Sequence, residues 1–318
     1  GTSGSSSADT ITIGRIMIPA MRTRGYNASY AASLAASGGI LGVIIPPSLI
    51  FIIYGIATST SIGELFIAGI IPGLLIALTL SISNSLVCRY STWALVDKKL
   101  FSFRKLLSAF WHAKWGLGAP LIILGGIYGG IFTPTEAAAV AVFYVFLVET
   151  VINKELGIRD IISSLTRAAI VTGILGPIIA FSILFGETLA ILRVPGNVVN
   201  FFVSMSVGHT ESVFMIIFVL LIMGCILEPI AAILVIMPIL LPIGMELGFD
   251  PVHFGVFVVS TLSVGFITPP VGINLFAASA VSGQPFLDIA SKALPAFVAL
   301  IVTVSAIAFL PDLILWFR

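Results

Sequence analysis

Charged residues are scarce in this chain of 318 residues: Asp, Glu, Lys and Arg together make up 9% of it, and hydrophobic residues make up 58%. The mean hydropathy is +1.18. A soluble domain carries about a quarter of its residues as charged side chains, so this chain lacks the polar surface of a soluble protein. Apolar stretches long enough for a helix to cross a bilayer recur along the chain. The short alternating pattern of a membrane barrel is absent, so the composition predicts an all-α polytopic membrane protein.

Cysteine, histidine and clustered acids are also scarce. Cys88 and Cys225 lie far apart in apolar surroundings and indicate neither a disulfide framework nor a metal site. The three histidines show no ligand spacing, and no Ser-His-Asp set, zinc-protease helix or phosphate loop is present. Most of the acids are expected in turns. The pattern therefore argues against an enzyme, which needs titratable groups held together.

Basic residues gather in one stretch, although the net charge is only +1. Between positions 89 and 114, where Asp97 is the single acid, lie six of the fifteen basic residues: Arg89, Lys98, Lys99, Arg104, Lys105 and Lys114. We expect this stretch to be a loop, and Lys154, Arg159 and Arg167 to mark a second polar loop. The positive-inside rule places both loops in the cytoplasm. The basic run is thus interpreted as a topology signal and not as a nucleic-acid-binding patch.

The chain contains an internal repeat. When the sequence is shifted without gaps so that Gly1 falls on Gly224, residues 1–72 fall on 224–295, and all four prolines of the first segment fall on prolines. The pairs are Pro19 and Pro242, Pro46 and Pro269, Pro47 and Pro270, and Pro72 and Pro295. Glycines and a short polar turn follow the same shift. Because composition alone does not align every proline, we infer two related halves.

Each copy has the same order of features. A Gly-headed segment (1–9, 224–232) leads into an apolar stretch that ends at Gly25 or Gly248. An apolar helix follows and meets a Gly-x-x-x-Pro-Pro interruption at 42–47 or 265–270. A further apolar stretch continues to about 58 or 281, and a long helix (64–89, 286–310) completes the copy. Between the copies we expect spans near 116–131, 135–152, 168–186 and 212–223.

The Pro-Pro pairs interrupt stretches that are otherwise apolar enough to span. Proline in a helix interior costs about 3 kcal/mol or more, because a hydrogen bond is lost and the ring clashes with the preceding turn. In lipid the freed carbonyls need protein or a polar cavity. Two interruptions at corresponding positions are typical of a transporter's binding site, where carbonyls suit a cation and half-helix N-termini suit an anion. The alternative is a pair of kinks that only help helices to pack.

The segments 1–7 and 224–229 invite a similar interpretation. Residues 1–7 are rich in Gly and Ser, so they fit either a flexible cloning linker or, because Gly1 aligns with Gly224, a native hydroxyl-rich hairpin tip. We favour a re-entrant hairpin in each copy. In the second copy Glu228 falls at the tip, where an acid in an apolar stretch indicates either a functional group or a residue beside an aqueous pocket.

One polar motif has a local structural explanation. Thr133-Pro134-Thr135-Glu136 has Thr at the N-cap, Pro at the first helical position and Glu three residues after the cap. This is a capping box, so the motif predicts the start of a helix over 134–152 and a structural role for Glu136.

Several motifs resemble the large membrane subunit of tripartite ATP-independent periplasmic (TRAP) transporters. They are Gly-x-Ser-Gly-Ser at 1–5, Leu-Gly-Val-Ile-Ile-Pro-Pro-Ser at 41–48, Gly-x-x-Pro-Gly at 69–73, Gly-Gly-Ile-Phe-Thr-Pro-Thr-Glu-Ala-Ala at 129–138, and Gly-x-x-Thr-Pro-Pro-Val-Gly at 265–272. The resemblance runs from the first residue to near the last. It implies an elevator-type fold with an inverted repeat, two re-entrant hairpins and two Pro-Pro-broken helices.

The resemblance also implies a function. Sodium entry would drive uptake of a carboxylated solute, such as a C4-dicarboxylate or sialic acid, across the bacterial inner membrane. A periplasmic binding protein would deliver the solute, and a small membrane subunit, separate or fused, would complete the scaffold. No cofactor is implied beyond Na⁺ as the coupling ion. The alternatives are a proton- or sodium-coupled carboxylate permease without a binding protein and, from another class, a membrane-embedded enzyme or scaffold.

Site residues follow from the same resemblance. The first sodium site would use Ser3, Gly4 and Ser5 with the backbone at Ile45 and Pro46. The second would use Gly224, Cys225, Gly265 and Thr268. The residues expected to face substrate are Ser48, Thr268 and Gly272.

We divide the chain into five parts on this basis. Residues 1–60 hold the first hairpin and broken helix without its N-terminal arm, and 61–115 hold a scaffold helix with the basic loop. Residues 116–210 hold second-repeat scaffold helices, 211–283 the second hairpin and broken helix, and 284–318 a C-terminal scaffold helix. Because the first hairpin needs an incoming arm, we expect a further piece of chain or a fused small subunit outside this sequence.

Overall fold

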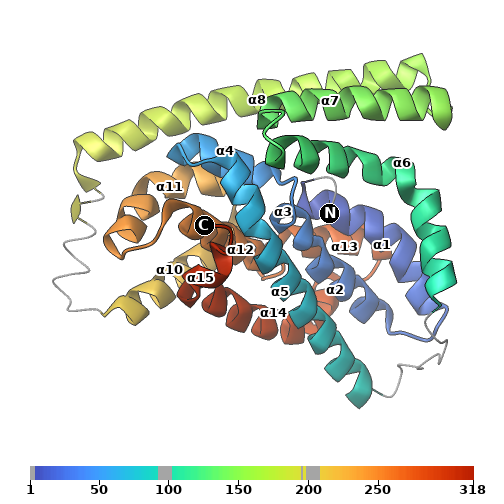
Figure 1. Cartoon of the computed structure of the whole chain (residues 1–318). Coiled ribbons are helices and arrows are strands. Elements are labelled where there is room, and N and C mark those ends of the chain that lie inside the picture. The colour runs from blue at the N-terminus through green and yellow to red at the C-terminus, as the bar shows by residue number, and fades with distance from the viewer. Residues whose placement is uncertain (1–3, 92–101, 195, 198–207) are drawn as a thin grey trace. The chain divides into compact units, whose positions relative to one another are not determined.

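The computed structural model describes residues 4–91, 102–194, 196–197 and 208–318 (Figure 1). Within these ranges the regular elements are helices and none is a strand. Six helices are long and apolar enough to cross a membrane, and a bent pair raises the number to seven. The prediction of an all-helical, multi-pass membrane protein is confirmed. The chain forms two compact units, residues 1–95 with 182–318 and residues 96–181, which are described separately.

The first unit contains both copies of the repeat. The first copy comprises α1 (Ser6–Arg22), α2 (Ala28–Gly39), α3 (Leu41–Ile44), α4 (Leu49–Thr58) and α5 (Ile62–Tyr90). The second comprises α11 (Pro229–Glu246), α12 (Pro251–Gly265), α13 (Ile273–Ser282) and α14 (Phe286–Phe309), preceded by α10 (His209–Ile226) and followed by α15 (Pro311–Ile314). The shift that aligns the sequence copies also brings the helix starts together, α1 with α11 and α4 with α13.

The same shift relates the backbone between the helices. Gly25 and Gly248 lie in the turn after the first helix of each copy, with φ angles of 82° and 83°, in the left-handed region that glycine adopts without steric cost. Both Pro-Pro bonds, Pro46-Pro47 and Pro269-Pro270, are cis. In each copy the Pro-Pro pair lies in the irregular segment between the two arms of the broken helix. The interruptions predicted from the prolines are therefore present in the fold.

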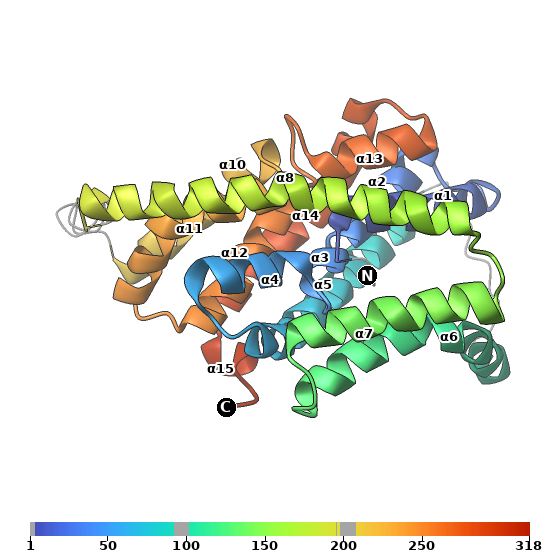
Figure 2. The same cartoon turned by 90° about the horizontal axis from the view of Figure 1, so that it is seen from above.

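Packing within this unit is crossed between the copies. Helix α1 packs against α13, and the corresponding helix α11 packs against α4 (Figure 2). Likewise α2 contacts α14, and α12 contacts α5. Tyr54 in α4 donates from Oη to Pro251 O at 2.8 Å, and Ser29 in α2 donates to Gln284 Oε1 at 3.2 Å. Helices of the two copies therefore pack against one another in a shared core.

The second unit is built around an antiparallel pair, α6 (Phe103–Tyr128) and α7 (Pro134–Leu147), followed by a π-helical turn at Val148–Ile152. Tyr144 Oη donates to Trp115 O at 3.0 Å between the two helices. Thr133 Oγ1 accepts from Glu136 N at 3.3 Å, and Glu136 Oε2 accepts from Thr133 N at 2.8 Å, so the predicted capping box is confirmed. Helix α8 (Ile158–Ile191) begins in this unit and continues into the first.

The basic stretch is not one loop, so that prediction was wrong in part. Helix α5 runs to Tyr90 and α6 begins at Phe103, which places Arg89, Arg104 and Lys114 in helices. Lys98 and Lys99 lie outside the described residues. The reason is visible in the spacing of Phe103, Leu106, Leu107 and Phe110, since apolar residues at these intervals form one helix face despite the basic residues between them.

The helices between the copies also extend beyond the predicted spans. In place of spans at 116–131 and 168–186, α6 starts at Phe103 and α8 covers Ile158–Ile191. Polar residues at their ends hid these extensions, because a hydropathy pattern reports only the apolar middle of a long helix.

Candidate functional site

Four helix N-termini line one small cavity in the first unit. Its wall includes the first residues of α1 (Ser6, Ser7), α4 (Leu49, Ile50), α11 (Pro229, Ile230) and α13 (Ile273). The first N–H groups of a helix have no partner within the helix, and its N-terminus has a partial positive charge of about 0.5. Among the lining residues none is Lys or Arg, so helix ends supply the positive potential. Their convergence makes the cavity suited to an anion.

Two of these N-termini are capped by side chains of the chain itself. Ser48 Oγ accepts from Phe51 N at 3.2 Å at the start of α4. Glu228 Oε2 accepts from Ile230 N at 2.9 Å and Ala231 N at 3.1 Å at the start of α11. Among the described residues no side chain caps α1, which follows Ser5, or α13, which follows Gly272, although Asn274 N in α13 donates to Phe266 O. The other N–H groups at these two ends are therefore the ones that a bound anion could cap.

The first predicted sodium site brings the hairpin against the broken helix. Gly4 has a φ of 68°, and a Cβ there would lie 3.1 Å from Leu49 N and 3.2 Å from Pro47 O. Only glycine combines this backbone angle with so close an approach. The Ser5 carbonyl oxygen lies 3.1 Å from where a Cβ on Gly42 would stand, so it also faces the first break.

The remaining residues of that site lie in or beside the break. Ile45 follows α3 as its C-cap, and Pro46 is the next residue. Ser3 lies outside the described residues. The structure thus brings Gly4 and Ser5 next to the segment that holds Ile45 and Pro46, and their role as sodium ligands stays a prediction.

At the second predicted sodium site, α10 packs against α12 and lies beside the second break. A Cβ on Gly265 would lie 2.6 Å from the Gly224 carbonyl carbon, so the two backbones are in direct contact. Gly272 N donates to Cys225 O at 3.2 Å, and Thr268 N donates to Gly265 O at 2.9 Å. All four predicted ligands therefore lie together, and their role as a cation site also stays a prediction.

The second hairpin tip is shorter than the predicted segment 224–229. Helix α10 continues to Ile226, so Gly224 and Cys225 lie in its last turn and the irregular residues are Leu227 and Glu228. Helices α10 and α11 are each long enough to cross a membrane, so re-entrance stays a prediction. Glu228 lines the cavity and caps α11, which gives the acid in this apolar stretch a local structural role.

The residues predicted to face substrate are placed around the breaks. Ser48 is fully buried, and its hydroxyl donates to Val43 O while it caps α4. Thr268 Oγ1 donates to Val264 O at 3.0 Å, and Gly272 starts α13 with a φ of 56°. Their neighbours Leu49 and Ile273 line the cavity. A direct contact of Ser48, Thr268 or Gly272 with substrate stays a prediction.

Sequence reasoning missed Asn274 and Ser6. Asn274 is fully buried, and its Nδ2 donates to Ser6 Oγ at 2.6 Å and to Ala36 O at 3.0 Å. An amide inside the apolar stretch directly after the second Pro-Pro pair was the available signal, since a buried polar group requires partners. Its partners are 268 and 238 residues away in sequence, so no local pattern identified them.

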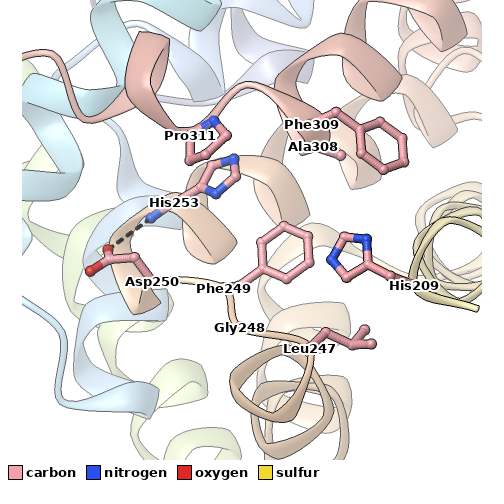
Figure 3. A pocket seen from close by; sticks show the side chains of 9 residues that line it. All are labelled: His209, Leu247, Gly248, Phe249, Asp250, His253, Ala308, Phe309 and Pro311. Carbon is pink, nitrogen blue, oxygen red and sulfur yellow. Dashed lines mark hydrogen bonds between the residues drawn. The ribbon is translucent and has the colours of Figure 1, made fainter.

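A second cavity lies at the turn between α11 and α12 (Figure 3). Its polar side chains are engaged within the protein: His253 Nε2 bonds Ile307 O at 2.8 Å, and Asp250 caps α12 and pairs with Arg318. Phe249 stacks between His209 and Phe257 in its wall. This cavity has aromatic walls and no converging helix breaks, so it is the weaker candidate. Among the described residues, no group of three or more His, Cys, Asp or Glu side chains could hold a metal ion.

Broken helices in two related copies, with helix N-termini around one cavity, are typical of membrane transporters. A family profile described as "Tripartite ATP-independent periplasmic transporter, DctM component" matches residues 1–313. The chain belongs to this family of transporter components, and it is not an enzyme. The resemblance inferred from the motifs is thereby confirmed.

Several transporter proteins match nearly the whole chain. It is 38% identical to the isethionate TRAP transporter permease protein DctMQ of Oleidesulfovibrio alaskensis over 99% of this chain and 49% of the relative. It is 38% identical to the C4-dicarboxylate large permease protein DctM of Pseudomonas aeruginosa, over 97% and 72%. It is 34% identical to the sialic acid large permease protein SiaM of Vibrio cholerae, over 98% and 73%. The chain thus spans about half of the first relative and nearly three quarters of the others.

Proposed function

We propose that this chain carries a carboxylated solute across the bacterial inner membrane as part of the large membrane subunit of a TRAP transporter. The observation that supports this most is the convergence of four helix N-termini on one cavity. A carboxylate bound there accepts hydrogen bonds from backbone N–H groups, and no basic side chain is needed. The relatives named for C4-dicarboxylate, sialic acid and isethionate transport organic anions, which agrees with such a site.

Sodium entry is the proposed driving force. Sodium is a hard cation that binds carbonyl and hydroxyl oxygens, and helix breaks supply carbonyls that no intrahelical N–H satisfies. Gly4 and Ser5 beside the first break, and Gly224 to Thr268 around the second, are the proposed sites. Both flank the segments whose helices open onto the cavity, so an ion bound at either site favours the geometry that binds the anion.

The proposed mechanism is elevator transport by an inverted repeat. Crossed packing between the copies supports a pseudo-two-fold relation, because the contacts of α1 with α13 and of α2 with α14 recur as those of α11 with α4 and of α12 with α5. The division into moving and scaffold parts at 60, 115, 210 and 283 stays a prediction. A periplasmic binding protein would deliver the solute, and a small membrane subunit would complete the scaffold, separately or fused as part of a longer chain.

Among carboxylates, the lining favours a compact dicarboxylate over a sugar acid. Five of the eleven lining residues are aliphatic, namely Val43, Leu49, Ile50, Ile230 and Ile273, and the polar side chains are those of three serines and Glu228. A sugar acid with many hydroxyl groups would replace only part of the hydrogen bonds that it loses to water in such a cavity. A four-carbon diacid has a short apolar body and two anionic ends, which match aliphatic walls and two uncapped N-termini.

Uptake into proteoliposomes tests the proposal. The full-length transporter is reconstituted with and without its binding protein, in sodium or choline, and supplied with labelled dicarboxylates and sugar acids. We expect uptake of a dicarboxylate that requires both sodium and the binding protein. Uptake without the binding protein, or equal uptake in choline, would show the alternative permease and overturn the proposal.

A further inference from the structure

Asn274, in the first turn of α13, contacts both copies of the repeat. Its Nδ2 donates to Ser6 Oγ at 2.6 Å and to Ala36 O at 3.0 Å, so the second copy reaches the first hairpin and α2. Its backbone N–H donates to Phe266 O at 3.0 Å, directly after Gly265. One residue therefore joins the surroundings of both predicted cation sites.

The orientation of the Asn274 amide follows from its partners. Ala36 O only accepts hydrogen bonds, so the amide NH₂ must face it. The amide oxygen Oδ1 is then left buried, with no hydrogen-bond partner among the described residues. An unsatisfied buried oxygen is unfavourable, and natural proteins retain such groups mainly where function requires them.

The first copy shows that the fold itself does not require an amide here. Phe51 occupies the position that the repeat aligns with Asn274, and it is fully buried, with its ring against Gly69. An apolar residue therefore fits this place in a broken helix. The fold thus does not require the amide of the second copy, and the hydrogen bonds of this amide go to residues of the first copy.

We propose that Asn274 couples the two cation sites, so that occupation of one favours occupation of the other. A cation at the second break orders residues 265–272, whose start and end are tied to α13 through Phe266 O and Gly272. Through its hydrogen bond to Ser6 Oγ, Asn274 then restrains Ser6 and the adjacent Ser5 at the first break. Coupling of this kind is reciprocal. Asn274 is a positioning residue, since Ile273 and not Asn274 lines the cavity. The proposal rests on the sodium-driven transport proposed above.

The test is a sodium titration of solute uptake by the full-length transporter in proteoliposomes with its binding protein, with choline replacing sodium. For the wild type we expect a Hill coefficient above 1. For Asn274→Ala we expect a coefficient near 1 and a half-saturating sodium concentration raised about fivefold. Ser6→Ala should also lower the coefficient, and the double variant should be no worse than Asn274→Ala, because Asn274→Ala already removes the hydrogen bond to Ser6. Ser282→Ala, near the other end of α13, is the matched control and should titrate like the wild type.

Asn274→Leu separates coupling from folding. Leucine nearly matches asparagine in shape and removes the unpaired Oδ1, which offsets part of the loss of the hydrogen bonds to Ser6 Oγ and Ala36 O. The unfolding temperature should therefore fall less than in Asn274→Ala, while the Hill coefficient falls to about 1. Cooperative uptake that persists in the Asn274 variants, or a wild-type Hill coefficient of 1, overturns the coupling and leaves the transport function intact. Wild-type uptake that is independent of sodium overturns both.

Discussion

The two copies of the repeat differ in which helix N-termini they cap. In the first copy Ser48 caps α4 after the break, whereas Ser5 makes no side-chain cap at α1. In the second copy Glu228 caps the hairpin helix α11, whereas the N-cap of α13 is Gly272, which has no side chain. A side chain therefore caps the helix after the break in the first copy and the hairpin helix in the second, although the backbone arrangement is the same. The proposed anion would meet one N-terminus without a side-chain cap from each copy, and one carboxylate, Glu228, on the second-copy side.

Pairs of residues that the repeat aligns show what it preserves. Gly42 and Gly265 both precede a break and both lie against a hairpin, but Gly42 faces the Asp9 side chain and Gly265 faces the Gly224 backbone. Phe51 corresponds to Asn274, and a neutral cap on α2, Asn27, corresponds to the acidic cap Asp250 on α12. The two copies therefore share their backbone geometry at these positions, whereas the side chains differ.

The largest expected effect is a loss of stability that differs between the two glycines lying against the hairpins, Gly265 and Gly42. Gly265→Ala would place a Cβ 2.6 Å from the Gly224 backbone, which cannot yield without moving a helix. We expect a destabilisation of about 3 kcal/mol, at the upper end for overpacking. Gly42→Ala meets mainly the end of the Asp9 side chain, which can rotate, so we expect about 1 kcal/mol. The measurement is the unfolding temperature of both variants in detergent, and equal decreases would contradict the distinction.

A smaller effect concerns the charge on the second-copy side of the cavity. Glu228→Gln keeps an oxygen to cap α11 and removes a negative charge beside the bound anion. We expect half-saturation at a solute concentration about two- to fivefold lower, from the usual effect of about 0.3–1 kcal/mol for a charge near a helix N-terminus. Solute titrations of uptake measure this. Glu211→Gln, in the first turn of α10 and outside the cavity lining, is the control. An unchanged or raised half-saturation for Glu228→Gln would show that the charge does not act on the solute.

The smallest expected effect is a pH dependence of stability that arises from Asp250, the N-cap of α12 in the second copy. Partial burial of Asp250 opposes its ionisation, but hydrogen bonds from Arg318, Val252 N and His253 N outweigh it and lower its pKa below the ordinary value. A lowered carboxyl pKa stabilises the fold above the ordinary value, and this stability is lost as pH falls through the folded-state pKa. The exposed pair with Arg318 keeps the effect small. Asp250→Asn, which copies Asn27, should flatten this part of the unfolding-temperature profile at acidic pH, and an unchanged profile would assign the dependence to other groups.

Local physical rules were sufficient to predict features whose interacting residues are close together in sequence. Paired prolines cannot continue a helix, so both breaks were readable, and the capping box at Thr133 to Glu136 was correct because its partners are three residues apart. The beginning of α6 was missed because its basic residues concealed an apolar face. The proposed ligands of the second sodium site were assembled by resemblance and were found close together, although the hairpin tip itself lies at Leu227 and Glu228.

The sequence by itself determined the class of protein, the repeat and the positions of the helix breaks, because composition, period and proline geometry act over a few residues. Only the tertiary structure decided that four helix N-termini share one cavity, which of them are capped, and that Asn274 reaches Ser6 across 268 residues. Those features depend on crossed packing between the copies. Contacts at such separation are set by the burial of the whole unit and leave no signature in a local pattern.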